Sequence, residues 1–582
     1  MKKQRQIWQP AKCGPSLVLF WLLLAFSFQP SAFATQYWIQ AQSGNDSNSG
    51  TSSSTPWQTF AHLNYGGGVT LQPGDVVKIG GVFNHTSDST ASSMQIANFN
   101  GTSSAPIIFT NWGFMAISNS GPNVNTMQIN TCSWLKFVGL TSTNAYRTPD
   151  FQGDVNCEIT GCAFGDTMNS QNGSLNGPAT FALNCQSNWI HGNVFGPSIT
   201  FFNSSGDAGQ HGVVFGTYFV GSPYDYTSCN IIESNTFWGG GHDTLGLYGQ
   251  SNLVQYNWTY SPPIWGFSQA PYYYGSRGFD IGGYLGSWNV VQYNSIGYCG
   301  MDTDAPGALT IDNGGLNLVR FNSIFGAAYN AIQIYGKGGA GPAGSNYILN
   351  NSVMLSSYAI SWTYPGNALS NYVTNVTWQY PMGFASTSNN MVVNNLLYAN
   401  FQNAWSFLEG PSVDMQVCLN NLTNVNPLWQ TTNSGLLLRQ PPYAPMTPPV
   451  FSLPPGSPAI AAGKWPATIA SASGAGTSFT VNDARWFFAG MQAASRTVPG
   501  DTIQLQGQAA TAVIAAITGN TITVSTSLTW TNGQGVALPY YGTAPDVGSQ
   551  AYQPQLALGG TGQATFIGSK TPNVIVTGTN AP

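Results

Sequence analysis

The chain has 582 residues, of which 13% are aromatic and only 6% charged, and its formal net charge is −5. This length allows several domains, or one elongated repeat fold with an accessory module. The scarcity of Lys and Arg excludes nucleic acid and any other partner held by a broad basic surface. The aromatic content argues against disorder, because these residues can supply a core.

Residues 1–34 have the features of a secretory signal peptide. Basic residues precede the apolar run "SLVLFWLLLAFSF", which is followed by "SAFA". The run is short for a membrane span, so we expect cleavage after Ala34, a secreted or periplasmic protein and no membrane contact afterwards. Eleven basic and twenty acidic residues then remain. Seven cysteines also remain, without metal-type spacing; one or two disulfides can form, but their pairing cannot be read.

The middle of the chain repeats an Asn-containing motif. Copies include "SNWIHGNVF" from Ser187, "CNIIESNTF" from Cys229, "SNLVQYNWT" from Ser251 and "WNVVQYNSI" from Trp288. The intervals of 22 to 44 residues fit coils of a parallel β-solenoid with inserted loops. We expect the repeated Asn to stack on its neighbours from coil to coil and to be structural, not catalytic.

Between these motifs lie segments with a period of two. They are "DTLGLYG" from Asp243, "RGFDIGG" from Arg277, "GALTIDNG" from Gly307 and "NAIQIYG" from Asn330. This alternation predicts strands in which Leu245, Leu247 and their equivalents point inward, and the residue between them outward. No sustained helical period competes, so the sequence predicts an all-β solenoid.

Segments at both ends of the solenoid resemble a known group. "QYWIQAQSGNDSNSGTSSSTPWQTF" and "LQPGDVVKIGGVFN" look like the N-terminal cap of secreted right-handed parallel β-helix proteins, and "GSPAIAAG" and "APDVGSQAY" look like their closing segment. That superfamily contains pectate lyases, chondroitinase-B-like lyases and several glycoside hydrolases. The resemblance implies a right-handed parallel β-helix with an N-terminal cap over residues 35–438.

The C-terminal part is expected to interrupt this closing segment. Residues 439–463 are a Pro-rich linker with the first closing piece, and residues 546–582 hold the second piece and a tail. Between them, residues 464–545 have short alternating strands and the turn signals Pro499-Gly500-Asp501 and Gly519-Asn520, which predict a small inserted β-domain.

Aligning the four alternating segments places carboxyl groups on neighbouring coils. Two outward rows result, one of Gly246, Asp280, Thr310 and Gln333, the other of Tyr248, Gly282, Asp312 and Tyr335. A strand spacing of ~4.8 Å and a two-residue step of ~6.7 Å predict about 8 Å between Asp280 and Asp312. That separation suits the carboxyl pair of an inverting glycosidase. At the strand starts, Asp243 is expected beside Arg277, just after His242.

Two loops add candidate groups. "GYCGMDTDAPGAL" carries Asp302 and Asp304, which in a lyase would hold Ca²⁺ with Asp280, while Arg277, His242 or Lys337 assists proton removal. An aromatic loop from Trp258 to Ser276 offers ring faces for stacking on sugars. The alternative is a purely structural role, in which these aspartates cap backbone amides and Asp243 and Arg277 form an ion pair.

We therefore expect a monomeric secreted enzyme that cleaves glycosidic bonds in an extracellular polysaccharide, by inverting hydrolysis at paired aspartates. The alternatives are a Ca²⁺-dependent lyase of a uronic-acid glycan, with Asp302 and Asp304 as metal ligands, and a non-catalytic glycan-binding protein; no cofactor is otherwise expected. Against the lyase, only Arg277, Arg320 and Lys337 are basic near the cluster; against a polygalacturonase, paired "DD", "GHG" and "RxK" motifs are missing. The candidate catalytic residues are Asp280, Asp312, Asp302, Asp304, Arg277 and His242. The candidate substrate-binding residues are Asp243, Tyr248, Trp265, Tyr273, Gln333, Tyr335 and Lys337.

Overall fold

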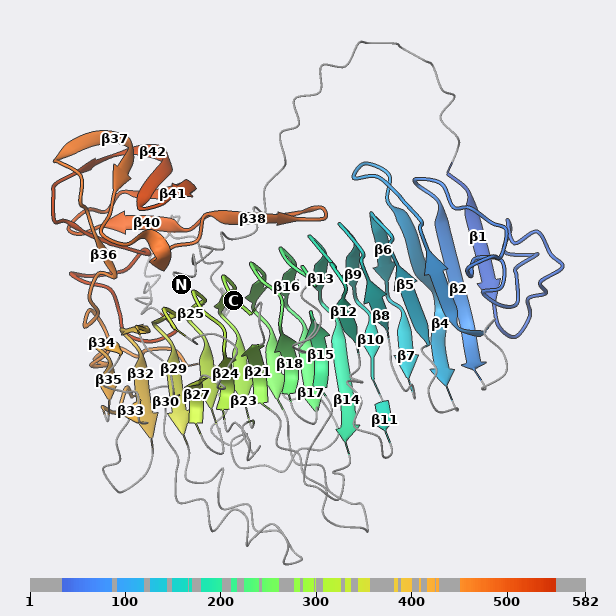
Figure 1. Cartoon of the computed structure of the whole chain (residues 1–582), viewed down its shortest axis with the longest axis horizontal. Helices are drawn as coiled ribbons and strands as arrows, with labels where there is room; N and C mark the ends of the chain where they lie inside the picture. Colours follow the sequence, from blue (N-terminus) through green and yellow to red (C-terminus); the bar gives the residue numbers. More distant parts are fainter. Residues whose placement is uncertain are drawn as a thin grey trace, which may run out of the picture.

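The computed structural model shows a right-handed parallel β-helix with an antiparallel β-domain alongside it (Figure 1). The fold expected from the sequence is thus confirmed. The structure describes residues 34–85, 92–119, 126–143, 149–165, 167–169, 179–200, 211–216, 225–239, 243–260, 277–282, 286–297, 299, 307–325, 330–335, 344–355, 382–385, 389–399, 408–409, 416–423, 425–428 and 451–550.

Each coil contributes one strand to each of three faces, and every strand pairs in parallel with its equivalents on the next coils. Face 1 is an 11-stranded sheet. Its strands are β3 (Met94–Ala97), β5 (Met127–Asn130), β8 (Asp150–Gln152), β12 (Thr180–Ala182), β15 (His211–Phe215), β18 (Asp243–Leu247), β21 (Arg277–Gly282), β24 (Gly307–Asp312), β27 (Asn330–Tyr335), β30 (Met382–Ala385) and β33 (Leu408–Glu409).

Faces 2 and 3 follow face 1 within each coil. Face 2 consists of β6 (Leu135–Val138), β9 (Glu158–Thr160), β13 (Trp189–His191), β16 (Ile231–Glu233), β19 (Leu253–Gln255), β22 (Val290–Gln292), β25 (Leu318–Arg320), β28 (Tyr347–Leu349), β31 (Met391–Val393) and β34 (Val417–Leu419). Face 3 consists of β7 (Thr141–Thr143), β10 (Ala163–Phe164), β11 (Thr167–Asn169), β14 (Val194–Thr200), β17 (Thr236–Gly239), β20 (Trp258–Tyr260), β23 (Ser295–Gly297), β26 (Ser323–Phe325), β29 (Ser352–Leu355), β32 (Leu396–Ala399) and β35 (Leu422–Thr423). The long strands β1 (Gln36–Gln40), β2 (Val76–His85) and β4 (Ile107–Asn119) start the solenoid.

Asparagine ladders fix the corners on both sides of face 2. At the second corner, Asn257 donates from its backbone N–H and from Nδ2 to Asn294 Oδ1, both at 3.0 Å, and also from Nδ2 to the carbonyl of Ile232 at 2.9 Å. The residue before it, Tyr256, has φ of 57°, a left-handed conformation that turns the chain sharply. Each Asn thus satisfies backbone groups that the tight corner leaves open, which confirms the structural role expected of it.

The same arrangement occurs at both corners of successive coils, whereas one repeated Asn was expected. The first ladder contains Asn188, Asn230, Asn252, Asn289, Asn317, Asn346 and Asn390. The second contains Asn193, Asn235, Asn257, Asn294, Asn322, Asn351, Asn395 and Asn421.

The interior of the solenoid is a continuous apolar core. Inward residues stack in columns, such as Phe151, Phe181 and Phe215, whose neighbouring ring centroids are 4.7 and 4.5 Å apart. Cys132, Cys157, Cys162, Cys185 and Cys299 lie buried in this core as thiols, and the thiol of Cys418 is partly buried. None of these six cysteines therefore forms one of the disulfides that export would allow. Within the described ranges, no helix has the length and hydropathy needed to cross a bilayer.

The inserted domain consists of an antiparallel sheet and a hairpin that reaches along the solenoid (Figure 1). The sheet contains β36 (Ala467–Thr468), β37 (Gly474–Thr480), β40 (Thr502–Leu505), β41 (Thr511–Thr518), β42 (Thr521–Trp530) and β43 (Gly535–Ala537); the hairpin is β38 (Gly490–Ala493) with β39 (Arg496–Pro499), preceded by the 3₁₀ turn η5 (Ala484–Trp486). Its apolar residues, among them Trp486 and Phe487, share one core with outward residues of face 2 such as Leu318 and Tyr347.

Candidate active site

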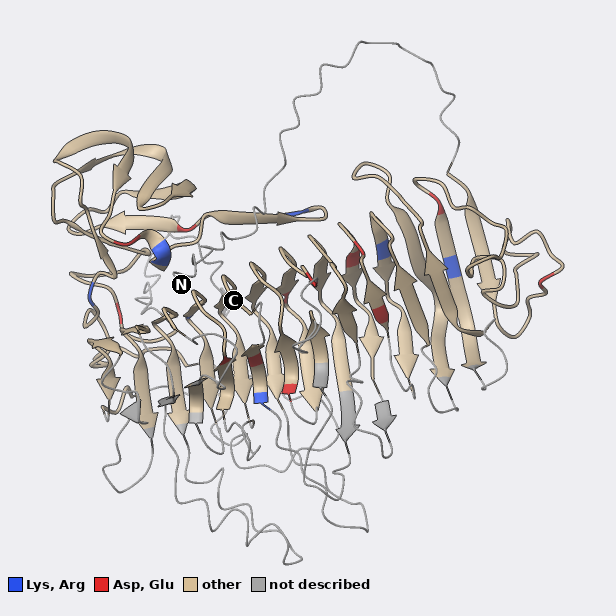
Figure 2. Ribbon diagram, viewed as in Figure 1, with Lys and Arg blue, Asp and Glu red and all other residues tan. Residues whose placement is uncertain are grey.

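The strand register on face 1 places the predicted rows as the sequence indicated. Asp280 pairs with Thr310, and Gly282 pairs with Asp312. On the preceding coil, Gly246 pairs with Asp280. Because the residues between these positions, such as Ile281 and Ile311, are in the core, Asp280 and Asp312 share the outer side of the sheet. The charged residues of β18, β21 and β24 stand close together on face 1 (Figure 2).

A break in the alternation brings Arg277 to the same outer side as Asp280. Strict alternation would direct Arg277 and Phe279 together into the core. A Cβ at Gly278 would lie 2.5 Å from the core atom Ile296 Cγ2, so position 278 faces inward as Phe279 does. The same break occurs one coil later, where the consecutive residues Ala308 and Leu309 are both buried in the core. As a result, Arg277 Nη1 lies 2.5 Å from Asp280 Oδ2 in a fully buried ion pair.

Tyr248 links two of the carboxyl groups. Its hydroxyl is 2.6 Å from Asp243 Oδ2 and 3.3 Å from Asp280 Oδ2. The ring lies back across the strand over Gly246, where a Cβ would come within 2.8 Å of it, so glycine is needed at that position. Burial, followed by the charges of Asp243 and Asp280, raises the pKa of Tyr248 well above 10, which keeps the hydroxyl protonated as a donor.

The second oxygen of Asp280 lies close to Gly282 and Asp312. Asp280 Oδ1 is buried and has no hydrogen-bond partner. A Cβ at Gly282 would lie 3.5 Å from this oxygen, 3.3 Å from Asp312 Cβ and 3.0 Å from the Asp312 carbonyl oxygen, so both aspartates pack closely around the glycine. Asp312 Oδ1 accepts a hydrogen bond of 2.6 Å from Asn313 Nδ2. Asp243, Arg277, Asp280 and Asp312 are each 0% exposed.

Two further predicted contacts lie on the next coil. Gln333 continues the row of Asp280 and Thr310 and is partly exposed, and Tyr335 pairs with Asp312 in the register. Thr310 Oγ1 donates back to the carbonyl of Gly307 at 3.3 Å. The rows of the candidate site therefore extend across β18, β21, β24 and β27.

Several predicted residues lie outside the described residues. These are His242, Trp265, Tyr273, Asp302, Asp304 and Lys337. Arg320, which the sequence placed near the cluster, instead lies in β25 on face 2. There its guanidinium binds Asp501 of the inserted domain, with both N–O distances 2.7 Å. Arg320 is close to Asp312 in the sequence, but between these residues the chain passes from face 1 to face 2.

Two ionisable residues were missed in the sequence but lie in register with the cluster. His211 of β15 pairs with Asp243. Glu409 of β33 pairs with Gly383, which itself pairs with Gln333 in the row of Asp280. The alternation in "HGVVF" was a usable signal for His211, since Val213 and Phe215 align with Leu245 and Leu247.

The described residues do not by themselves make a calcium site. Asp280 Oδ1 is one open carboxylate oxygen, but the same carboxyl group is paired with the Arg277 cation. No group of three His, Cys, Asp or Glu side chains among the described residues is arranged to hold a metal. Ca²⁺ prefers six to eight oxygen ligands, so the metal-dependent alternative requires Asp302 and Asp304.

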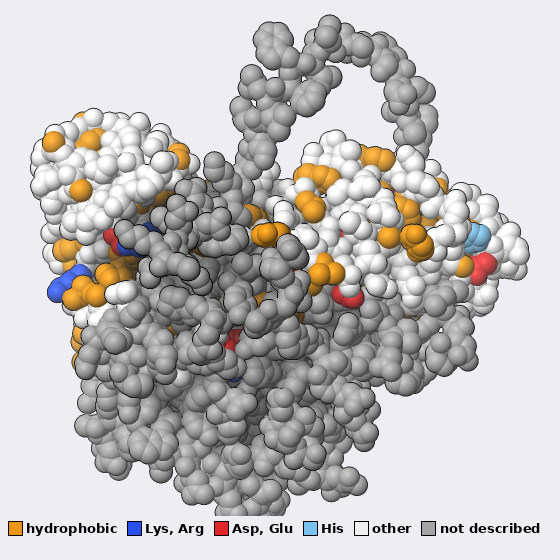
Figure 3. All heavy atoms as spheres, in the orientation of Figure 1, with side chains coloured by type: hydrophobic (Ala, Val, Ile, Leu, Met, Phe, Trp, Pro, Cys, Tyr) orange, Lys and Arg blue, Asp and Glu red, His pale blue; other side chains and the backbone are white. Residues whose placement is uncertain are grey.

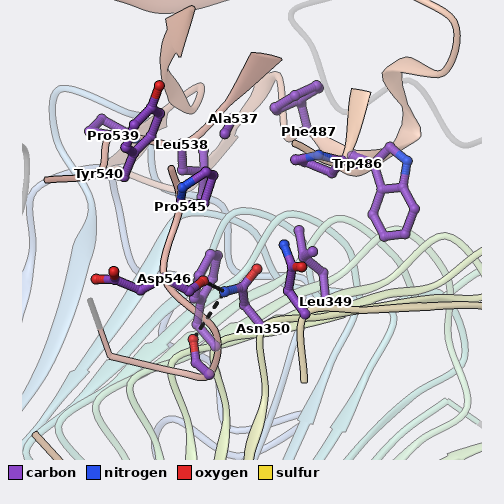
Figure 4. Close-up of a pocket in the computed structure, with 14 residues that line it drawn as sticks. Leu349, Asn350, Trp486, Phe487, Ala537, Leu538, Pro539, Tyr540, Pro545 and Asp546 are labelled. Atoms are coloured by element: carbon purple, nitrogen blue, oxygen red, sulfur yellow. Dashed lines mark hydrogen bonds between the residues drawn. The ribbon is translucent and has the colours of Figure 1, made fainter. Parts of the chain in front are cut away.

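A separate pocket lies at the seam between face 2 and the inserted domain (Figure 4). Its walls include Phe321, Trp486 and Tyr540, and its lining contains no member of the carboxyl cluster. Asn350 Nδ2 is already bonded to the carbonyl oxygens of Asp546 and Gly548 at 2.7 and 3.2 Å. This pocket therefore belongs to the contact that holds the closing segment in place.

No protein-family model matches the chain, and no curated protein matches it. Several solved structures are similar in chain path. The pectate lyase Pel9A matches with a TM-score of 0.45 and 14% identity, over 89% of this chain and 96% of that chain. The GH136 lacto-N-biosidase from Eubacterium ramulus matches with a TM-score of 0.41 and 13% identity, over 66% and 67%. An alginate lyase from Paenibacillus sp. gives 0.37 and 12%, over 60% and 93%. The strand pairings described above define the fold of this chain.

Proposed function

We propose that the protein is a polysaccharide-cleaving enzyme whose reaction takes place at Asp280 and Asp312 on the outer side of face 1. The observation that supports this best is the buried, unpartnered Asp280 Oδ1, which lies on the outer side of the sheet that Asp280 shares with Asp312. A carboxyl pair on adjacent coils is the minimum set for glycoside hydrolysis. The signal-like residues 1–34 support action outside the cytoplasm, on an extracellular glycan.

In the hydrolytic course, one carboxyl group protonates the glycosidic oxygen while the other takes a proton from water. The water attacks the anomeric carbon from the side opposite the leaving group, which inverts its configuration. Arg277 and Tyr248 hold the Oδ2 side of Asp280, which leaves Oδ1 as its unpartnered oxygen. Because neither carboxyl group is exposed, the site must open to admit a glycan chain.

The second candidate is Ca²⁺-dependent β-elimination on a uronic-acid glycan. The open, buried Asp280 Oδ1 favours it, because such an oxygen is a ready ligand for a cation. Arg277, His242 or Lys337 would assist proton removal in this reaction.

A screen of the full-length protein against neutral and uronic polysaccharides tests the proposal. Reducing ends without a rise in absorbance near 235 nm indicate hydrolysis. A rise near 235 nm that a chelator abolishes indicates the lyase. Binding without any product over the whole panel would contradict the enzymatic proposal and leave a glycan-binding protein.

A further inference from the structure

The solenoid has very few positive charges. Between residues 35 and 438 the sequence contains six Lys or Arg, against seventeen Asp or Glu. The described surface accordingly shows few charged side chains (Figure 3). A solenoid with this excess of acidic residues repels a polyanion at long range unless cationic side chains are concentrated where the polyanion binds.

Most of these six Lys and Arg side chains already contact other groups of the protein. Arg277 is buried against Asp280, Arg320 is paired with Asp501 of the inserted domain, and Lys136 Nζ lies 2.9 Å from Glu158 on face 2. Lys78 lies in β2 of the N-terminal coil, over the ring of Trp38. Only Arg147 and Lys337, both outside the described residues, remain from the solenoid to neutralise a substrate carboxylate.

Face 1 instead presents amide side chains on the coils that precede the carboxyl pair. Gln95 pairs with Gln128, and Asn130 pairs with Gln152, across β3, β5 and β8. All four point outward, because Ile96, Ile129 and Phe151 beside them are in the core, and all four are partly exposed. Asn130 Oδ1 is a buried acceptor with no hydrogen-bond partner.

These amides lie on the same two outward rows as the carboxyl pair. The row of Gln95 and Gln128 continues through Asp150, Thr180, Val214 and Gly246 to Asp280. Four strand spacings of ~4.8 Å separate β8 from β21, so Gln152 lies about 19 Å from the reaction centre along the solenoid axis. That span is long enough to hold several sugar rings of an extended glycan.

We propose that the substrate is a neutral polysaccharide, which extends from the Asp280–Asp312 pair over face 1 toward β3. This inference rests on the proposed function and names its substrate class. Amides donate and accept hydrogen bonds without net charge, which suits hydroxyl groups, whereas the site offers no described free cation for a uronate. A neutral substrate also excludes β-elimination, because that reaction requires a carboxyl group on the sugar.

A matched pair of polymers tests the substrate class. Native polygalacturonate and the same polymer after chemical reduction of its carboxyl groups differ in charge but share the chain linkage. Both are measured for binding by affinity electrophoresis and for release of reducing ends, alongside neutral galactans, glucans, xylans and mannans. We expect binding and cleavage among neutral polymers, with the native polyuronate neither bound nor cleaved. Cleavage of native polyuronate in preference to every neutral polymer overturns the inference but leaves the enzymatic proposal standing. Binding of neutral polymers without cleavage of any polymer overturns the enzymatic proposal alone.

Variants on the amide row test the path. On the cleaved neutral polymer, Gln128→Ala and Asn130→Ala should each raise KM roughly 3- to 10-fold with little change in kcat, which is the effect of a lost hydrogen bond. Gln58→Ala, an exposed glutamine in the N-terminal cap, is the matched control and should leave KM unchanged. A KM in both face 1 variants equal to that of the control would overturn the proposed path.

Discussion

At the scale of single residues, small side chains organise the candidate site as much as charged ones do. Gly246 leaves room for the Tyr248 ring to lie back toward Asp243, and Gly282 allows Asp312 to pack closely beside the strand of Asp280. The sequence predicted the carboxyl pair because alternation assigns every second residue to one side. It could not predict the Arg277–Asp280 ion pair, because that contact depends on the local break in alternation at Gly278.

Tyr248→Phe tests the role of the hydroxyl in holding Asp280. We expect kcat to fall roughly 10- to 100-fold, because a hydrogen bond to a charged group is lost. The pKa of Tyr248 is raised well above 10, so its ionisation should not shape the pH–rate profile of the wild type below that value. The measurement is kcat against pH for both proteins. If the alkaline limb disappeared in the variant, Tyr248 would itself be the titrating acid.

Gly282→Ala tests the close packing of Asp280 and Asp312 around this glycine. The added methyl group would lie 3.0 Å from the Asp312 carbonyl oxygen and 3.3 Å from its Cβ, and it would occupy the space beside Asp280 Oδ1. We expect at least a 100-fold loss of activity with a modest fall in melting temperature. Gly474→Ala in β37 of the inserted domain, where a Cβ meets only contacts of 3.4 Å or more with Trp530, is the matched control. Retained activity in Gly282→Ala would contradict the placement of the reaction.

At the level of strands and turns, the Asn-containing corners explain why the solenoid could be predicted from the sequence. A coil must turn twice around face 2, and each turn leaves backbone groups that an Asn at a fixed position satisfies. The motif therefore repeats even where loops make its spacing irregular. One repeated Asn was predicted and two ladders exist, because the first Asn of each motif, such as Asn252, forms a ladder of its own five positions before the second.

Asn294→Ala tests the ladder. The substitution leaves the Asn257 N–H and the Val254 carbonyl without their partner in the buried corner. We expect the free energy of unfolding to fall by about 2–4 kcal/mol, measured by chemical denaturation. Asn421→Ala at the partly buried end of the same ladder is the matched control, with an expected loss of about 1 kcal/mol. Equal losses would show that stacking within the ladder adds nothing.

At the scale of the whole molecule, the inserted domain is bound along face 2 by polar contacts as well as by a shared core. Arg320 with Asp501 and Arg496 with Glu233 join residues far apart in the sequence. The sequence predicted a β-domain here from its turns and alternation. It could not predict where the domain docks, because no local pattern encodes a pairing between residues 181 positions apart.

The seam between the two parts should be sensitive to acid. Burial opposes ionisation of Glu158, but hydrogen bonds from His191 and Lys136 outweigh it and lower the pKa of this carboxyl below 4.5. At Asp483, hydrogen bonds from Arg485 and Tyr347 likewise outweigh burial and lower the pKa below 3.8. Both groups bind protons less tightly in the folded state, so their stabilisation is complete above about pH 4–5 and is lost as pH falls through the folded pKa values.

Melting temperature measured between pH 3 and pH 7 checks this expectation. The wild type should lose stability steeply below about pH 4, and Glu158→Gln should show a lower melting temperature at neutral pH with a shallower acid decline. Parallel curves for the two proteins would contradict a contribution of Glu158 to the acid sensitivity.

In the proposed reaction, Asp280 and Asp312 act together to cleave a glycan. The most direct measurement is the initial rate of reducing-end release by the wild type, Asp280→Asn and Asp312→Asn, with the anomeric configuration of the first product read by NMR. We predict an inverted product from the wild type and an initial rate at least 1,000-fold lower in each variant, with folding retained. Cleavage by both variants at the wild-type rate would contradict it.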